Sequence, residues 1–275
     1  MRLNIPIGQL ALLACATLAG GCTTAPRATD ADTSGVRIER VDKEFDIDKG
    51  VTRIAVDNPW GEINVRGREE REVGIHAVFQ RKPPQHRQVS LRSHREGDTL
   101  HVEVVMDGAP VSAEARPVRA DIAVYVPGDL AIALSTRDAR ISATRRPGAI
   151  EAKTGSGEIR ASSFGQLTLH SDSGEIRAMA VGKRWRGASE ISTDSGRIVL
   201  VVPTFGDIAL DARTGGNLHT GFGLSVHALP NGGHEAHARY GAGTSELRAR
   251  STNGEIVLEQ LVLLGDDKEL PEDDD

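Results

Sequence analysis

Short runs of alternating apolar and polar residues cover residues 36–126. They lie at residues 36–41, 53–56, 62–65, 73–78, 89–91, 100–104 and 122–126. An apolar residue at every second position is typical of β-strands that bury one face. Turn-forming sequences separate the runs, and residues 108–117 are expected to form a longer loop. The alternation therefore predicts a β-rich N-terminal region without helices.

From residue 127 to residue 264 the alternation becomes an internal repeat. Residues 148–161 and 165–178 align closely, and both end in Ser-Gly-Glu-Ile-Arg-Ala. Looser copies lie at residues 130–143, 191–200, 208–219 and 247–258. Each copy contains two short strands joined by a turn rich in Ser, Thr, Asp, Asn and Gly. We expect the turn glycines to adopt positive φ, and the polar side chains to hydrogen-bond the turn backbone.

The apolar residue that opens the second strand recurs at a nearly constant spacing. Successive markers lie 18, 17, 22 and 20 residues apart, and they are Ile141, Ile159, Ile176, Ile198 and Leu218. A single copy cannot bury its own apolar face, so each marker is expected to lie on its equivalent in the copy before. The spacing favours an all-β fold in which a β-solenoid-like stack of repeats follows the N-terminal region. The alternative is a set of antiparallel hairpins, which Asn253 and Gly254 would suit.

The start of the chain has the pattern of a secretory signal. Arg2 is followed by an apolar stretch at residues 5–18 and by small residues before Cys22. This order predicts a signal peptide over residues 1–21 and not a membrane-spanning helix. Cys22 resembles the cysteine on which bacterial lipoproteins are acylated. The sequence therefore predicts a protein held in the cell envelope by acyl chains on Cys22, at the outer membrane and facing the periplasm or the surface.

One position departs from the lipoprotein pattern. The third residue before Cys22 is Ala19, where a large aliphatic residue is favoured. The alternative is cleavage near residues 14–16, which would release a soluble periplasmic protein. With cleavage at Cys22, the mature chain contains no other cysteine, and residues 22–35 form a flexible tether.

The net charge of −6 is concentrated at the C-terminus. Residues 266–275 hold seven acidic residues and one lysine, which account for the whole net charge. The remainder is balanced and lacks the basic footprint of a nucleic-acid-binding protein. We predict that residues 265–275 form a disordered acidic tail.

Motifs for catalysis or metal binding are incomplete. His234 and His237 are three residues apart in a glycine-rich stretch, where zinc metalloproteases have two histidines four apart on a helix. We expect a solvated loop there. Serines at the turns, such as Ser156 and Ser173, lack the two flanking glycines of a nucleophile elbow. The sequence predicts no catalytic residue, no metal site and no cofactor.

Several motifs occur in a characteristic order. They are Gly-Glu-Ile-Asn-Val at residues 61–65, Val-Pro at residues 126–127, the Ser-Gly turns at Gly157, Gly174 and Gly196, and Asn-Gly-Glu-Ile at residues 253–256. Together they resemble the bacterial putative-adhesin family of domains of unknown function, over residues 44–264. The resemblance implies a β-solenoid-like protein of the cell envelope and supplies no activity.

The repeat also predicts a regular charged face. Arg160 and Arg177 follow the marker isoleucines and point away from the core, and Arg197 comes next along the row of glutamates. These three arginines are the predicted binding face, for an unidentified envelope glycan or protein. The sequence thus favours a non-catalytic binding or structural module, adhesin-like in character. The alternative is a glycan-active envelope enzyme with a parallel β-helix, which would need carboxylates gathered at one site.

Overall fold

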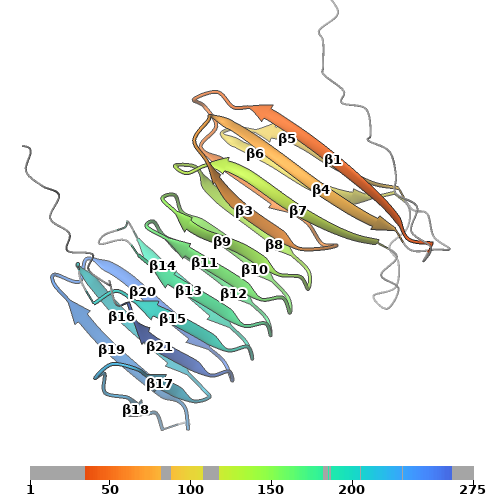
Figure 1. Ribbon diagram of the computed structural model, residues 1–275. Coiled ribbons are helices and arrows are strands. Elements are labelled where there is room, and N and C mark those ends of the chain that lie inside the picture. The colour runs from red at the N-terminus through yellow and green to blue at the C-terminus, as the bar shows by residue number, and fades with distance from the viewer. Residues whose placement is uncertain are drawn as a thin grey trace, which may run out of the picture.

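The computed structural model describes residues 35–81, 88–107, 118–181, 185, 187–204, 206–230 and 232–261. Their regular structure is entirely β-strand, arranged in two facing sheets (Figure 1). The predicted all-β class is therefore confirmed. The described residues contain no helix that would be long and apolar enough to span a membrane.

Each sheet combines strands from distant parts of the chain. Sheet A contains, in spatial order, β1 (Arg37–Asp46), β4 (Glu72–Arg81), β7 (Val118–Pro127), β3 (Ile63–Arg68), β9 (Ile141–Arg146), β11 (Ile159–Ser163), β13 (Ile176–Ala180), β15 (Ile198–Val202), β21 (Ile256–Gln260) and β17 (Leu218–Thr220). Sheet B contains β18 (His227–Ala228), β19 (His234–Tyr240), β16 (Ile208–Thr214), β20 (Ser245–Ser251), β14 (Ala188–Thr193), β12 (Leu167–Ser171), β10 (Ile150–Thr154), β8 (Ala131–Thr136), β2 (Arg53–Asp57), β6 (Thr99–Met106) and β5 (Val89–Glu96).

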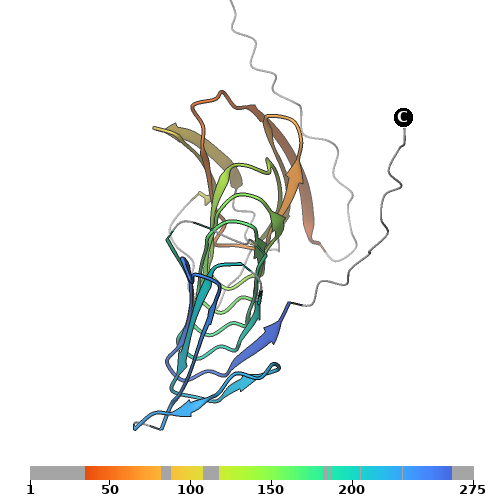
Figure 2. The ribbon, with the colours of Figure 1, turned by 90° about the vertical axis from the view of Figure 1, so that its left-hand side faces the viewer.

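The repeat region is a solenoid. Each coil contributes one strand to sheet B and the next strand to sheet A, and successive coils pair in parallel. The register aligns Ile150 with Leu167 in sheet B and Ile159 with Ile176 in sheet A. Parallel pairing excludes the hairpin alternative for these coils, which lie one above another in Figure 2.

The N-terminal strands continue the same stack. Ile63 of β3 pairs in parallel with Ile141 of β9, and β2 pairs in parallel with β8. One apolar core therefore runs through both parts of the chain. Antiparallel strands flank its ends: β1, β4 and β5 at one end, and β18 and β19 at the other.

The coils do not stack strictly in chain order. The coil of β20 and β21 lies between the coil of β14 and β15 and that of β16 and β17. Leu218 therefore lies beside Ile256, and the prediction that Leu218 lies on Ile198 is wrong. The spacing of the marker residues along the chain is compatible with either stacking order of the last coils, because the inserted coil offers equivalent apolar residues to the coils on both sides. The N-terminal end of the stack also departs from chain order. There β2 lies between β8 and β6, and β3 lies between β9 and β7.

The corner between the sheets carries a column of buried hydroxyl groups. Its members are Thr136, Thr154, Ser171, Thr193, Ser251 and Thr214. In four coils the hydroxyl oxygen accepts a hydrogen bond from the amide of a glycine three residues later. One example is Gly174 N to Ser171 Oγ, at 2.8 Å. The predicted hydrogen bonding of the turns by their polar side chains is confirmed.

The corner glycines are needed for a different reason from the one predicted. Positive φ is found at other glycines, such as Gly97 and Gly243, and not at Gly157 or Gly174. A β-carbon on Gly174 would instead lie 1.9 Å from the carbonyl oxygen of Gly157 in the adjacent coil. Glycine permits this close approach of two backbones. The expectation of positive φ is therefore wrong at these corners.

Candidate functional site

The predicted lipid anchor lies outside the described residues. This applies to Cys22, to the signal over residues 1–21, to the tether up to residue 34 and to the acidic tail. The anchor therefore stays a prediction from the sequence.

The predicted arginine face lies on the outer surface of sheet A. Arg160 and Arg177 are directly paired in the register of β11 and β13, and their side chains are 53% and 52% exposed. Arg197 precedes β15 and lies in the row of glutamates, so the structure does not align it with the other two. Val199 occupies the place beside Arg177 instead.

Glutamates neutralise these arginines. Arg160 forms an ion pair with Glu158, and this hydrogen bond raises the pKa of the Arg160 guanidinium. Arg177 lies 3.9 Å from Glu175, and Arg197 lies 2.8 Å from Glu255. The surface is therefore a network of exposed ion pairs, which contribute little to stability because solvent screens them.

The histidine pair is on a strand and not in the loop that the sequence predicts. His234 and His237 both belong to β19, where an odd separation places their side chains on opposite faces. His234 Nδ1 lies 2.8 Å from the carbonyl oxygen of Gly216, whereas His237 lies beside Asp211 and Glu235. The two imidazoles therefore cannot share one metal ion.

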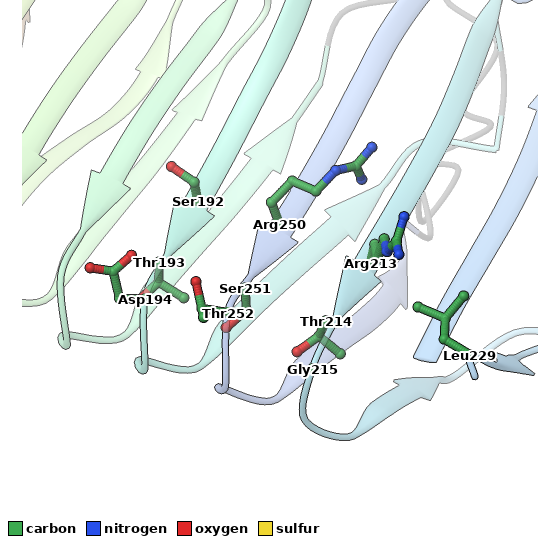
Figure 3. A pocket seen from close by; sticks show the side chains of 10 residues that line it. All are labelled: Ser192, Thr193, Asp194, Arg213, Thr214, Gly215, Leu229, Arg250, Ser251 and Thr252. Atoms are coloured by element: carbon green, nitrogen blue, oxygen red, sulfur yellow. The ribbon is translucent and has the colours of Figure 1, made fainter. Parts of the chain in front are cut away.

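A hollow of about 360 Å³ lies on the outer face of sheet B, near its corner (Figure 3). Neighbouring strands β14, β20 and β16 form its floor. Its lining residues are Ser192, Thr193, Asp194, Arg213, Thr214, Gly215, Leu229, Arg250, Ser251 and Thr252. We call it the Arg213 hollow. Parallel register brings Ser192, Arg250 and Arg213 side by side, although they are widely separated in the chain.

The two guanidinium groups of the hollow differ in their partners. Arg250 forms an ion pair with Asp211 and donates a second hydrogen bond to its carbonyl oxygen at 2.9 Å. Arg213 is exposed and makes no ion pair with another described residue. Its planar set of donors is available to a ligand that carries a carboxylate, sulfate or phosphate.

Three other lining residues determine what else the hollow can bind. Asp194 is exposed at the end away from Arg213, the exposed Thr252 lies between the two, and Leu229 forms an apolar wall beside Arg213 (Figure 3). Asp194 can accept hydrogen bonds, and the Thr252 hydroxyl can donate or accept them. The hollow thus offers a cation, an anion and a hydroxyl group around one open space.

A larger hollow of about 620 Å³ lies over Gly74 on sheet A, near the N-terminal end of the stack. Tyr125, Arg68 and His76 are among its lining residues. Arg68 lies 2.8 Å from Glu72 and 3.1 Å from Glu70, and His76 contacts Asp42. Carboxylates contact Arg68 and His76, and the third cationic group, Lys43, donates a hydrogen bond to the carbonyl oxygen of Leu91. This hollow is therefore less suited to an anionic ligand than the Arg213 hollow.

Sequence reasoning missed the Arg213 hollow. Alternation along β16 does place Arg213 on the solvent face. However, Arg213 and Ser192 frame one hollow only because β20 inserts between their strands. No signal in the repeat spacing distinguishes this order from sequential stacking.

No protein-family model matches the chain, and no curated protein matches it. Three solved structures are similar, each over 81% of this chain. A putative cell adhesion protein from Clostridium sporogenes is 12% identical, is covered over 100% of its own chain and has a TM-score of 0.44. A putative adhesin from Bacteroides fragilis is 10% identical, with 97% coverage and a TM-score of 0.27. A putative lipid binding protein from Parabacteroides distasonis is 9% identical, with 97% coverage and a TM-score of 0.22.

Proposed function

We propose that this chain is a non-catalytic binding module of the cell envelope that holds an acidic saccharide in the Arg213 hollow. The observation that carries the proposal is the exposed Arg213 guanidinium, without an ion-pair partner among the described residues, at the edge of a polar hollow. Elsewhere on the outer faces, arginines such as Arg160 and Arg197 already contact carboxylates.

An acidic saccharide matches the groups of the hollow. The guanidinium of Arg213 can bind a sugar carboxylate with two parallel hydrogen bonds. Asp194 and Thr252 can bind sugar hydroxyl groups, and Leu229 can contact the apolar face of a ring. The strands beneath fix the backbone from which these side chains extend, so the backbone need not be ordered when the ligand binds, which lowers the entropic cost of binding.

The composition of the hollow favours binding over hydrolysis. Most glycosidases act through two carboxylates placed on either side of the scissile bond. Asp194 is the one carboxylate among the residues that line this hollow. The alternative of a glycan-active enzyme therefore has less support at this site.

Placement in the envelope rests on the sequence. The signal pattern before Cys22 supports export, and acyl chains on Cys22 would hold the module at the membrane. A flexible tether at residues 22–35 would allow the solenoid to contact a glycan at some distance from the membrane.

Calorimetric titration of the full chain tests the proposed ligand class. Oligosaccharides of glucuronic acid should bind, and uncharged oligosaccharides of glucose should bind more weakly. Arg213→Gln should lower the affinity for the acidic ligand about tenfold, which corresponds to the loss of one charge-assisted hydrogen-bond pair. Arg239→Gln is the matched control, because Arg239 is exposed on β19 but does not line the hollow. Equal affinities of Arg213→Gln and the wild type would refute this site.

The Arg160 and Arg177 row is a second candidate for the same function. Its support is the direct pairing of two exposed guanidinium groups on neighbouring strands. A polyanion would have to compete with Glu158 and Glu175 for them, so we rank this surface below the Arg213 hollow.

A further inference from the structure

We propose that the hairpin of β5 and β6 binds a divalent transition-metal ion, Zn²⁺ in the first instance, through His94, Glu96 and His101. The proposal does not depend on the Arg213 hollow, since these strands lie at the other end of sheet B. The sequence predicts no metal site, and its only histidine motif lies elsewhere, on β19.

The three side chains converge on one face. His94 and His101 are directly opposite each other in the antiparallel register, and Glu96 lies two residues after His94 on the same strand. The imidazole rings are stacked, with centroids 4.8 Å apart and planes 8° apart. His101 Nε2 is 3.9 Å from a carboxylate oxygen of Glu96, and the candidate ligand atoms all lie within 4.8 Å of one another.

These distances are close to those of a metal site. Zinc binds imidazole nitrogen and carboxylate oxygen at about 2.0–2.2 Å, so tetrahedral ligands lie about 3.4 Å from each other. The two imidazole planes are nearly parallel, so the ring of His94 has to turn before a nitrogen of each ring can point at one ion, and the exposed position of His94 leaves room for that turn. Two imidazoles and one carboxylate form a donor set typical of Zn²⁺ and related ions, and the hard ions Mg²⁺ and Ca²⁺ prefer oxygen ligands.

The backbone of the hairpin is held firmly, so the positions from which the three ligand side chains extend are fixed. Gly97 adopts a φ of 60° in the turn. The carbonyl oxygen of Asp98 accepts hydrogen bonds from Thr52 N at 2.9 Å and from Arg53 N at 3.3 Å. Arg95 also forms an ion pair with Asp48 at 2.7 Å. The turn is thus fixed to the segment that leads into β2.

The site has room for further metal ligands. On β2, the neighbour of His101 is Ala55, followed on β8 by Ala133. Their small side chains help to form a hollow of about 200 Å³ that His101 also lines. Water or a group from a partner can therefore complete the coordination of an ion held by three protein ligands.

Metal binding would also secure the edge of sheet B. Among the described strands, β5 is at the edge of sheet B and pairs with β6 alone. An ion bound to His94 and His101 would connect these two strands directly. Because the ion binds the folded hairpin, it would stabilise this end of the stack.

The test is a titration of the full, chelator-treated chain with Zn²⁺, without an affinity tag. We expect one ion per chain, and shifts of the His94 and His101 ring resonances in ¹H–¹⁵N spectra. His94→Gln, His101→Gln and Glu96→Gln should each weaken binding at least tenfold. The matched control is His227→Gln, an exposed histidine on β18, which should bind like the wild type.

Melting curves of the metal-free variants should match that of the wild type, because the substituted residues lie on the surface. Zn²⁺ should raise the melting temperature of the wild type and the control only. Two results would overturn the proposal. One is absence of binding at Zn²⁺ concentrations up to about 100 μM. The other is a zinc affinity of His94→Gln or His101→Gln that equals the wild-type value.

Discussion

A β-carbon on Gly254 would lie 1.8 Å from the carbonyl oxygen of Gly196. The two glycines occupy the same corner of adjacent coils, although they are far apart in the chain. Their approach is possible because the C-terminal coil inserts beside β15. The close stacking of the solenoid therefore depends on glycine at this corner. This holds for adjacent coils that are far apart in the sequence as well as for consecutive ones.

Gly254→Ala should destabilise the protein by about 1–3 kcal/mol or more, because the added methyl group forces two backbones apart. Thermal unfolding should show a clearly lower midpoint. Gly67→Ala is the matched control, since Gly67 is exposed on β3 and an added β-carbon meets nothing within 4 Å. Equal midpoints for the two variants would contradict the corner contact.

Ile176→Asp should unfold or strongly destabilise the coils. Ile176 is fully buried between Ile159 and Ile198, so the substitution loses about 1.5–3 kcal/mol of apolar burial and adds the cost of burying a carboxylate. Thr168→Ala should have a small effect, because Thr168 lies exposed on β12. Denaturant unfolding compares the two. A wild-type-like transition for Ile176→Asp would be incompatible with the apolar ladder.

Acid should loosen the contact between the β5–β6 hairpin and the solenoid. A hydrogen bond from the Thr52 hydroxyl lowers the pKa of Asp98, and one from Arg95 lowers the pKa of Asp48, both from an ordinary value of 3.8. A carboxyl group whose pKa is lower in the folded state stabilises the fold above its ordinary pKa. This stabilisation is lost as the pH falls below about 4 and through the folded-state pKa.

Hydrogen exchange of the β5 and β6 amides between pH 6 and pH 3 measures this effect, after correction for the intrinsic exchange rates. Protection in the wild type should decrease towards pH 3. The double variant Asp48→Asn with Asp98→Asn should have lower protection at pH 6 and a weaker dependence on pH. An unchanged pH dependence in the double variant would show that other groups control the acid response.

Cys22→Ser should move the protein from the membrane fraction to the soluble fraction, because the acyl chains can no longer be attached. The solenoid should stay folded, since Cys22 precedes all described strands. Fractionation and labelling with a fatty-acid probe measure the two effects separately. A wild-type protein that takes up no label would show that the predicted anchor is wrong.

Much of the fold could be predicted from the sequence. The alternation around Ile159 and Ile176 identifies the strands, and their spacing identifies parallel coils. These features follow from local periodicity and from the need to bury one face of every strand. The order of the last coils could not be predicted, because Ile256 and Leu218 are equally suitable neighbours for Ile198.

The surface sites depend on that order and on register. Arg213 lies beside Arg250 because of the inserted coil, so the repeat alone could not locate their hollow. The pairing of His94 with His101 could have been predicted from the sequence. A two-residue turn at Gly97 and Asp98 sets a register in which His94 faces His101, and the turn sequence at residues 95–98 indicates this hairpin.

Retention of the full chain on isolated bacterial envelope glycans tests the proposed function most directly. The wild type should be retained. The Arg213→Glu variant should not be retained, although its melting temperature should equal that of the wild type. Arg160→Glu with Arg177→Glu, on the opposite sheet, should be retained like the wild type. Retention of Arg213→Glu at the wild-type level, or loss of retention in the Arg160 and Arg177 double variant alone, would contradict binding through the Arg213 hollow.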